Sequence, residues 1–189
     1  MVRTFLAINL PDRQIHQLSE AVEQWRRYRA AVRWTTASRL HLTLKFLGDV
    51  PEDMLPVISS ACRQVAGRSR PFELHMGTTG TFPSMKRPRV LWVGLTSPSG
   101  RPLHTLQEAL ETSLEGVGLP RDERPFSPHV TVGRVKSGRN IRQLMETFMA
   151  YEPDRSPFTV DSFALYSSTL TPKGPIYRQI DRFVFMPGP

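Results

Sequence analysis

Residues 39–50, RLHLTLKFLGDV, and residues 126–135, FSPHVTVGRV, decide the fold. Each stretch contains a histidine and a threonine separated by one apolar residue. Successive side chains of a β-strand point to opposite faces, so the histidine and the threonine of each stretch share one face. The leucines or valines between them form the other face. The pattern predicts two strands that pack on a core through their apolar side and present imidazole and hydroxyl groups on the opposite side.

The chain around these stretches contains the same order of elements twice. Apolar or alternating runs predict strands over 3–10, 40–48 and 72–82, and again over 89–95, 129–135, 158–168 and 175–185. Runs with helical spacing predict helices over 13–30, 52–66, 101–117 and 140–150. The first strands of the two series are offset by 86 positions (89 minus 3) and the histidines by 88 (129 minus 41). We therefore interpret the chain as an internal duplication.

The duplication predicts an α+β fold. We expect residues 1–189 to form a single two-lobed domain, with repeat 1 at about 1–86 and repeat 2 at about 87–189. Each repeat is expected to contribute an antiparallel-rich sheet with helices on its outer face. A pseudo-two-fold axis would relate the two repeats around a central cleft. We expect the two histidine strands to face one another across that cleft.

Composition and charge indicate the kind of partner. The 189 residues are 39% hydrophobic, enough for a compact core, and no apolar run approaches the roughly 18 residues that cross a membrane. With no secretory signal and a single cysteine, we expect a cytoplasmic protein without membrane contact, in which Cys62 is a buried apolar residue. The net charge is +8, and only four of the 25 basic residues are lysine. Guanidinium groups match phosphate oxygens in pairs, so nucleic acid or a nucleotide is the favoured partner. The arginines of WRRYRAAVRW (25–34) are nevertheless interpreted as a solvated helix face.

Two histidines on either side of a reacting centre suit general acid–base catalysis, because imidazole titrates near neutral pH. If His41 and His129 converge in one cleft, one can accept a proton while the other donates one, as in-line displacement at phosphorus requires. The hydroxyls of Thr43 and Thr131 can donate hydrogen bonds to nonbridging phosphate oxygens. This scheme requires no metal and no cofactor. Zinc binding by the two histidines stays an alternative, although zinc usually takes a third protein ligand that the motifs do not supply.

Strand alternation assigns the residues that follow the motifs. Arg134 falls on the valine face, so it can contact phosphate only if Gly133 permits a bulge or twist. Lys45 falls on the histidine face near the rim of the cleft. Phe46 falls on the leucine face, where we expect it to pack, and whether either residue contacts substrate stays open. Trp92 is assigned to the core. The remaining histidines are interpreted as structural or solvent-exposed: His16, His75 and His104.

The segments HLTLKFLG (41–48) and HVTVGR (129–134) resemble the paired HxTx motifs of the two-histidine phosphoesterase superfamily. They resemble specifically its RNA 2',3'-cyclic phosphodiesterases, also described as 2'-5' RNA ligase-like proteins. Three further segments are similar to the framework of that branch: RTFLAINLP (3–11), GTFPSMKRPRVLWVGL (80–95) and LYSSTLTPKGPIYRQI (165–180). The resemblance spans nearly the whole chain and implies a bilobal α+β fold with a central cleft.

The resemblance also implies an activity, the metal-independent hydrolysis of an RNA 2',3'-cyclic phosphate end to a 2'-phosphate, within RNA processing. His41 would donate a proton to the departing 3' oxygen, and His129 would accept the proton of the attacking water. Thr43 and Thr131 would hold the phosphate, with Arg134 assisting. The expected partner is RNA or a nucleotide with such an end, and the expected protein is a monomer.

Three alternatives stay open at this level. The same site could join RNA ends through a 2'-5' linkage without ATP, or it could open a small cyclic nucleotide. The protein could also be a non-catalytic RNA-binding module whose histidines only position phosphate. The intact copies of both motifs argue against this last alternative.

Overall fold

The computed structural model describes residues 1–172 and 174–187, so Lys173 in the predicted framework segment and the last two residues of predicted repeat 2 lie outside the described residues. Within the described part, the chain forms four α-helices: α1 (Asp12–Arg26), α2 (Leu55–Ala66), α3 (Pro102–Glu115) and α4 (Ile141–Met149). It also forms nine β-strands: β1 (Val2–Asn9), β2 (Val32–Trp34), β3 (His41–Val50), β4 (Phe72–Ser84), β5 (Arg87–Thr96), β6 (His129–Val135), β7 (Phe158–Val160), β8 (Ser162–Thr171) and β9 (Gly174–Val184).

The strands form one hydrogen-bonded path in the order β7-β4-β5-β6-β3-β1-β8-β9, with β2 paired to β6. The pairings are antiparallel, which confirms the expected α+β class and its antiparallel character. At the centre of the path, β3 and β6 are joined through one register pair, Leu42 opposite Val130. The two histidine strands are therefore neighbours in the sheet. The expectation that they face one another across a cleft is wrong.

Each side of this central junction combines strands from both parts of the sequence. β4 pairs with β5 on one side, whereas β8 and β9 extend the sheet beyond β1 on the other. As a result, β3 and β6 are inner strands of one sheet and lie next to each other at its centre. The predicted repeat boundary near 86 and 87 falls in the tight turn between β4 and β5. The internal duplication itself, and the description as one two-lobed domain, stay predictions.

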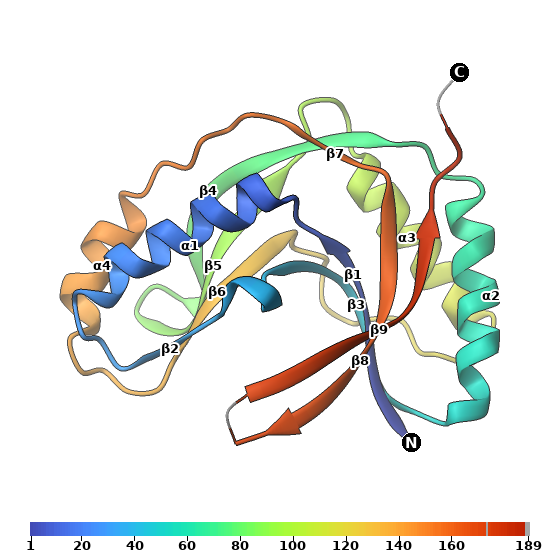
Figure 1. The fold of residues 1–189 in the computed structure, drawn as a ribbon, viewed down its shortest axis with the longest axis horizontal. Helices are drawn as coiled ribbons and strands as arrows, with labels where there is room; N and C mark the ends of the chain where they lie inside the picture. The colour runs from blue at the N-terminus through green and yellow to red at the C-terminus, as the bar shows by residue number, and fades with distance from the viewer. Residues whose placement is uncertain (173, 188–189) are drawn as a thin grey trace.

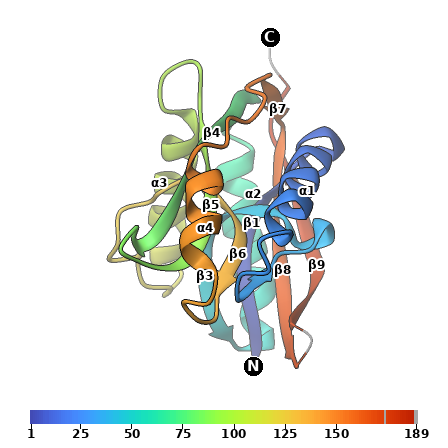
Figure 2. The same ribbon diagram turned by 90° about the vertical axis from the view of Figure 1, so that its left-hand side faces the viewer.

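The helices cover the sheet in two pairs. α2 packs on α3, and these helices contact β9 and β3 respectively, whereas α1 packs on α4, which contacts β4. Figure 1 shows the two pairs at opposite ends of the molecule, and Figure 2 views the end that carries α1 and α4. No helix among the described residues has both the length and the apolar character needed to span a bilayer.

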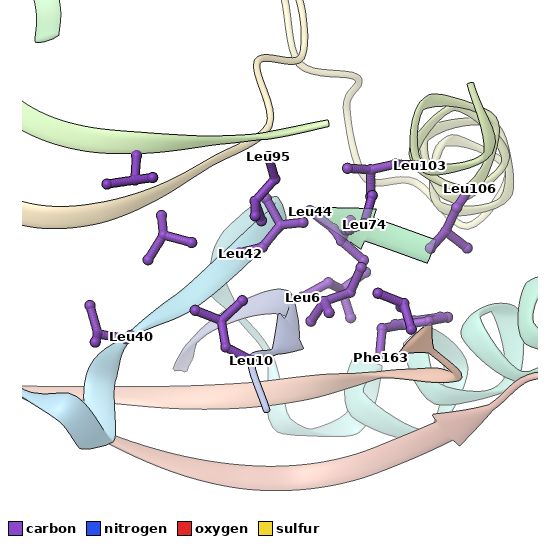
Figure 3. Close-up of a cluster of buried hydrophobic side chains, with 14 of the residues drawn as sticks. Leu6, Leu10, Leu40, Leu42, Leu44, Leu74, Leu95, Leu103, Leu106 and Phe163 are labelled. Atoms are coloured by element: carbon purple, nitrogen blue, oxygen red, sulfur yellow. The ribbon is translucent and has the colours of Figure 1, made fainter. Parts of the chain in front are cut away.

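The core lies between the sheet and the helices. Leu42 and Leu44 of β3 and Val130 and Val132 of β6 are fully or almost fully buried, as the alternating pattern predicts. Figure 3 shows the leucines of β3 among apolar side chains from the other strands and from α3: Leu6, Leu74, Leu95, Leu103, Leu106 and Phe163. Burying such a side chain stabilises a fold by roughly 1.5–3 kcal/mol. The strands that carry the histidines are therefore anchored firmly on their apolar side.

The segment after the first helix differs from the sequence prediction. The helix expected over 13–30 ends at Arg26, because Arg29 adopts a φ of 50°, outside the helical region. Residues 32–34 then form β2 against β6. Arg33 therefore lies on a strand, and its assignment to a solvated helix face is wrong.

The strand expected over 158–168 is divided in two. β7 ends at Val160 and pairs with β4, whereas β8 begins at Ser162 and pairs with β1 on the other side of the sheet. At Asp161 the chain crosses from the edge strand β7 to β8, which lies between β1 and β9. The buried residues change from even positions, Phe158 and Val160, to a run that begins at Phe163, so the segment is not one alternating strand.

Candidate active site

The register of the two central strands places the motif residues side by side. Leu42 and Val130 are directly opposite each other in an antiparallel pair. One residue further along, this register sets Thr43 beside His129, and one residue back it sets His41 beside Thr131. All four side chains are on the face opposite to the buried leucines and valines. Two equivalent strands that pair antiparallel through equivalent residues have the relation that a local two-fold axis produces.

Both strands contain a β-bulge just after the motif. In the pairing of β1 with β3, Leu6 is opposite Lys45 and Ala7 is opposite Thr43, so that Leu44 has no partner. In the pairing of β5 with β6, Val132 is skipped in the same way. The two skipped residues are 88 positions apart, as the histidines are (132 minus 44). A bulge inserts one extra residue and so reverses which face each following side chain takes.

On β3 this reversal turns Lys45 toward the core and Phe46 toward the cavity, the opposite of what strict alternation predicts. Lys45 is only 2% exposed, and its Nζ donates to Glu111 Oε2 on α3 at 2.6 Å and to the Pro120 carbonyl at 2.8 Å. Phe46 is 61% exposed and lines the cavity beside the histidines. The expectations that Lys45 lies at the cleft rim on the histidine face and that Phe46 packs in the core are both wrong, because the bulge at Leu44 intervenes.

On β6 the same reversal brings Arg134 to the cavity, as the bulge hypothesis for this strand requires. Gly133 occupies the position that Lys45 has on β3, and here the neighbour is β2. A Cβ atom on Gly133 would lie 2.7 Å from Val32 Cγ1 and 3.0 Å from Trp34 Cε3. The glycine therefore permits the close approach of β2, while the guanidinium of Arg134 faces the cavity. Its contact with phosphate stays a prediction.

The two imidazoles are held in the same way. His41 Nδ1 lies 2.7 Å from the Arg39 carbonyl oxygen, and His129 Nδ1 lies 2.6 Å from the Ser127 carbonyl oxygen. A carbonyl oxygen only accepts, so each Nδ1 carries the proton and each neutral ring has its lone pair on Nε2. Thr43 Oγ1 is 3.1 Å from His41 Nε2, to which its hydroxyl can donate. Both rings therefore present Nε2 as the atom that gains and loses a proton.

Burial lowers the pKa of both His41 and His129 below the ordinary histidine value of about 6.5. The hydrogen bond to a backbone carbonyl opposes this effect in each ring. Positive charge nearby adds to it, from His129 in the case of His41 and from Arg134 in the case of His129. At neutral pH both rings are therefore neutral in the free protein, with Nε2 unprotonated.

The motif face opens on a cavity of about 1130 Å³, which corresponds to the expected central cleft. Its walls come from β2, β3, β4, β5, β6, β9 and the loop before β6, and they hold both histidines and both threonines of the motifs. Its charged lining residues are mostly arginines: Arg33, Arg39, Lys45, Arg89, Arg121, Asp122, Glu123, Arg124 and Arg134. Arg121 is paired with Glu108 and Lys45 with Glu111, so the remaining arginines give the cavity a positive field.

Aromatic rings pack against each histidine, and strand alternation did not identify most of them. Phe5 and Tyr177 contact His41, with ring centroids 5.0 and 5.4 Å away. Phe82 lies 5.0 Å and Trp92 6.0 Å from the ring of His129. Trp92, which the sequence assigned to the core, is half-buried and lies beside the ring of His129. Position in the sequence gives no signal for Tyr177, because β9 reaches the cavity only through its pairing with β8.

The other histidines lie away from this site or outside its motif face. His16 is exposed beside Glu20, 3.5 Å away, and His104 packs on Phe126. Cys62 is fully buried, as expected, and burial raises the pKa of its thiol to about 12. Among residues 1–172 and 174–187, no group of three or more His, Cys, Asp or Glu side chains has an arrangement that could hold a metal ion.

Comparison with known proteins gives a consistent result. The sequence profile of the 2'-5' RNA ligase superfamily matches residues 11–171. A protein of Thermotoga maritima named RNA 2',3'-cyclic phosphodiesterase is 35% identical over 178 residues, which are 94% of this chain and 92% of the relative. The similarity to this relative therefore extends over nearly the full length of both chains.

Solved structures share the fold as well. The crystal structure of TT0787 of Thermus thermophilus superposes with a TM-score of 0.82 at 30% sequence identity, covering 97% of each chain. The structure of Escherichia coli LigT complexed with 3'-AMP superposes with a TM-score of 0.76 at 26% identity, covering 97% of this chain and 98% of that one. This chain therefore has the same overall fold as these two proteins.

Proposed function

The chain belongs to the 2'-5' RNA ligase superfamily, and from this premise we propose that it is a phosphoesterase that hydrolyses RNA 2',3'-cyclic phosphate ends to 2'-phosphates. The observation that carries the proposal is the pair of imidazoles on adjacent strands, each with an unprotonated Nε2 at the same cavity. Relatives named RNA 2',3'-cyclic phosphodiesterase support the choice of substrate.

The proposed reaction is an in-line displacement at phosphorus. His129 Nε2 accepts a proton from water as the water oxygen attacks, and the bond between phosphorus and the 3' oxygen breaks. His41, protonated on Nε2, donates its proton to that departing oxygen. The products are a 2'-phosphomonoester and a free 3' hydroxyl, and the two histidines have exchanged protonation states. Water restores them before the next turnover.

The threonines complete the proposed site. When His41 is protonated on Nε2, it no longer accepts the hydrogen bond of Thr43, whose hydroxyl becomes available to the phosphate. Thr131 has the equivalent place on β6, and both hydroxyls donate to nonbridging oxygens whose charge grows in the transition state. Arg134 adds a guanidinium on the same face. Bound phosphate also raises the pKa of His41, which favours the protonated form that the donor needs.

The test is product analysis without metal. Protein treated with EDTA is incubated with an oligonucleotide that ends in a 2',3'-cyclic phosphate, and the product is compared by chromatography with 2'- and 3'-phosphate standards. We expect the 2'-phosphate at a rate that EDTA does not change. A 3'-phosphate product, or activity that EDTA removes and a divalent metal restores, contradicts the proposal. RNA that binds with salt-sensitive affinity but shows no turnover would indicate a binding module instead.

A further inference from the structure

Two arginines face each other across neighbouring strands at one end of the cavity. Arg33 of β2 is directly opposite Arg134 of β6, and both side chains are exposed and line the cavity. Figure 1 shows β2 as a short strand beside β6. Paired residues of this kind have Cβ atoms about 5 Å apart, so the two guanidinium groups begin from neighbouring points on one face.

The alternation within β2 fixes the direction of Arg33. Val32 and Trp34 both approach Gly133, and Trp34 stacks on the buried Trp25 with ring centroids 5.9 Å apart. Both side chains pack against the core, and Trp34 also reaches the cavity wall. Arg33 lies between them and takes the opposite face, which is the face of the cavity.

Like charges directly opposite each other destabilise a sheet, so this pair is unfavourable in the free protein. Within residues 1–172 and 174–187, no carboxylate oxygen lies within 4.0 Å of either guanidinium. Local unfavourable choices of this kind concentrate at functional sites. An anion between the two groups would convert the repulsion into attraction, and a phosphate suits their geometry.

The position of the pair relative to the histidines indicates which phosphate this is. Along β6 the order from the reacting centre outward is His129, Thr131 and then Arg134, with Arg33 on the adjacent strand. Arg134 is on the same strand as His129 and Thr131, whereas Arg33 reaches the cavity from β2, which pairs with β6 only beyond the motif, at residues 133–135. This placement assigns the terminal phosphate to Arg134 and a neighbouring phosphate to Arg33.

We propose that Arg33 binds the phosphodiester that precedes the terminal nucleotide, so that the protein prefers an RNA strand with a cyclic phosphate end over a cyclic mononucleotide. This inference rests on the proposed function and specifies its substrate. The chemistry recognised is a phosphate on the 5' side of the terminal ribose. A 5'-phosphorylated mononucleotide contains the same group, and it therefore has its own arm in the test.

The test compares kcat/KM for three substrates: a 2',3'-cyclic mononucleotide with a 5' hydroxyl, the same compound with a 5'-phosphate, and a dinucleotide with a cyclic end. In Arg33→Gln we expect the ratio of kcat/KM for the dinucleotide to that for the 5'-hydroxyl compound to fall about five- to tenfold, the upper range for one ordinary hydrogen bond, since the guanidinium is exposed to solvent. The loss should appear in KM, and the salt dependence of log kcat/KM should become shallower by about 0.7 for the lost phosphate contact.

Arg68→Gln is the matched control, because it removes one charge from an exposed position that does not line the cavity. It should leave the substrate ratio unchanged. Arg33→Lys should fall between the wild type and Arg33→Gln, because a lysine retains charge without the planar fork. A Tm of Arg33→Gln equal to or above that of the wild type would show that the loss is not unfolding.

Several outcomes would overturn the inference. An unchanged ratio in Arg33→Gln, or an equal loss in Arg68→Gln, means that Arg33 does not contact that phosphate. A loss confined to the 5'-phosphorylated mononucleotide means that the site takes a terminal phosphate and not an RNA strand. If the wild type hydrolyses none of the three compounds, the proposed function fails. Arg33 is then judged by the Kd of a dinucleotide ending in a 2'-phosphate, which should rise about five- to tenfold in Arg33→Gln.

Discussion

Strands β3 and β6 both run from an HxT motif into a β-bulge, and both present the next-but-one residue to the cavity. That residue is Phe46 on β3 and Arg134 on β6. The position just before it is a buried Lys45 on β3 and Gly133 on β6. The two strands therefore match through the motif and differ immediately after it. In the proposed reaction the acid and the base take equivalent positions about the phosphorus, whereas the substrate around it has no symmetry.

The two imidazoles both pack against aromatic rings and differ in the charged group that lowers their pKa. His41 packs against the buried Phe5 of β1 and against Tyr177 of β9, which lines the cavity. His129 packs on Phe82 at the β4 side, where Arg134 adds positive charge. Each imidazole thus packs against two aromatic rings. Arginines line the cavity near both of them, Arg39 beside His41 and Arg134 beside His129.

The largest effect is expected where the two strands match. We predict that His41→Ala and His129→Ala each lower kcat for a cyclic-ended oligonucleotide by about 10³-fold, within the range of general acid–base catalysis. The double variant should cost about as much as either single one, because the pair acts as a unit. Steady-state kinetics measures all three variants, with His16→Ala as the control at an exposed position outside the cavity.

The same variants can separate donor from acceptor. A substrate with a nitrophenolate leaving group in place of the 3' oxygen needs no proton on departure, so it should restore activity in His41→Ala and not in His129→Ala. Equal restoration in both variants would contradict the assignment of the two roles. Single losses that multiply in the double variant would contradict the joint mechanism.

The next effect is expected where β3 departs from β6. We predict that Lys45→Met lowers the free energy of unfolding by about 3–5 kcal/mol, because it leaves the carboxylate of Glu111 buried without its cation. Lys45→Met combined with Glu111→Leu should recover most of that loss, since a buried ion pair replaced by apolar residues is often neutral. Urea unfolding curves measure both. A stable Lys45→Met protein with a raised KM for RNA would instead show that Lys45 contacts substrate.

The buried pair also shows what the sequence could and could not predict. Alternation within β3 and β6 correctly predicts the strands, their buried faces and the common face of each histidine and threonine. It fails from Lys45 and Phe46 onward, because a bulge depends on the register of the neighbouring strand. The partner of Lys45 lies 66 residues away on α3, and nothing in the local pattern points to Glu111.

Arg33 illustrates a second limit. Three residues are too short for a periodic signal, so β2 was not predicted and its arginine was grouped with the helix before it. The pairing of β4 with β5 and of β8 with β1 could not be predicted either, because alternation identifies a strand without identifying its partner. Residues such as Tyr177 reach the cavity only through those pairings. The motif residues were predictable because each pair is defined within a single strand.

The smallest effect concerns the charges that each histidine senses. After burial, the pKa of His41 is lowered by His129, whereas that of His129 is lowered by Arg134. We therefore predict that His129→Ala raises the pKa of His41, and that Arg134→Gln raises the pKa of His129, because each change removes positive charge that opposes protonation. NMR titration of the imidazole resonances measures both, and Arg68→Gln should change neither.

These directions set the expected pH dependence. In the proposed reaction His129 is the base and must be neutral, so its pKa should set the acid limb of kcat/KM, below pH 6.5, and this limb should move upward in Arg134→Gln. The stability of the free protein should follow the same sign. Both folded-state pKa values lie below that of an unfolded histidine, so the unfolded chain binds more protons as the pH falls below about 6.5, and the free energy of unfolding should decrease there. A pKa of His41 that stays unchanged in His129→Ala would show that the charge on His129 does not affect His41, and that the two motif strands are not coupled through their charges.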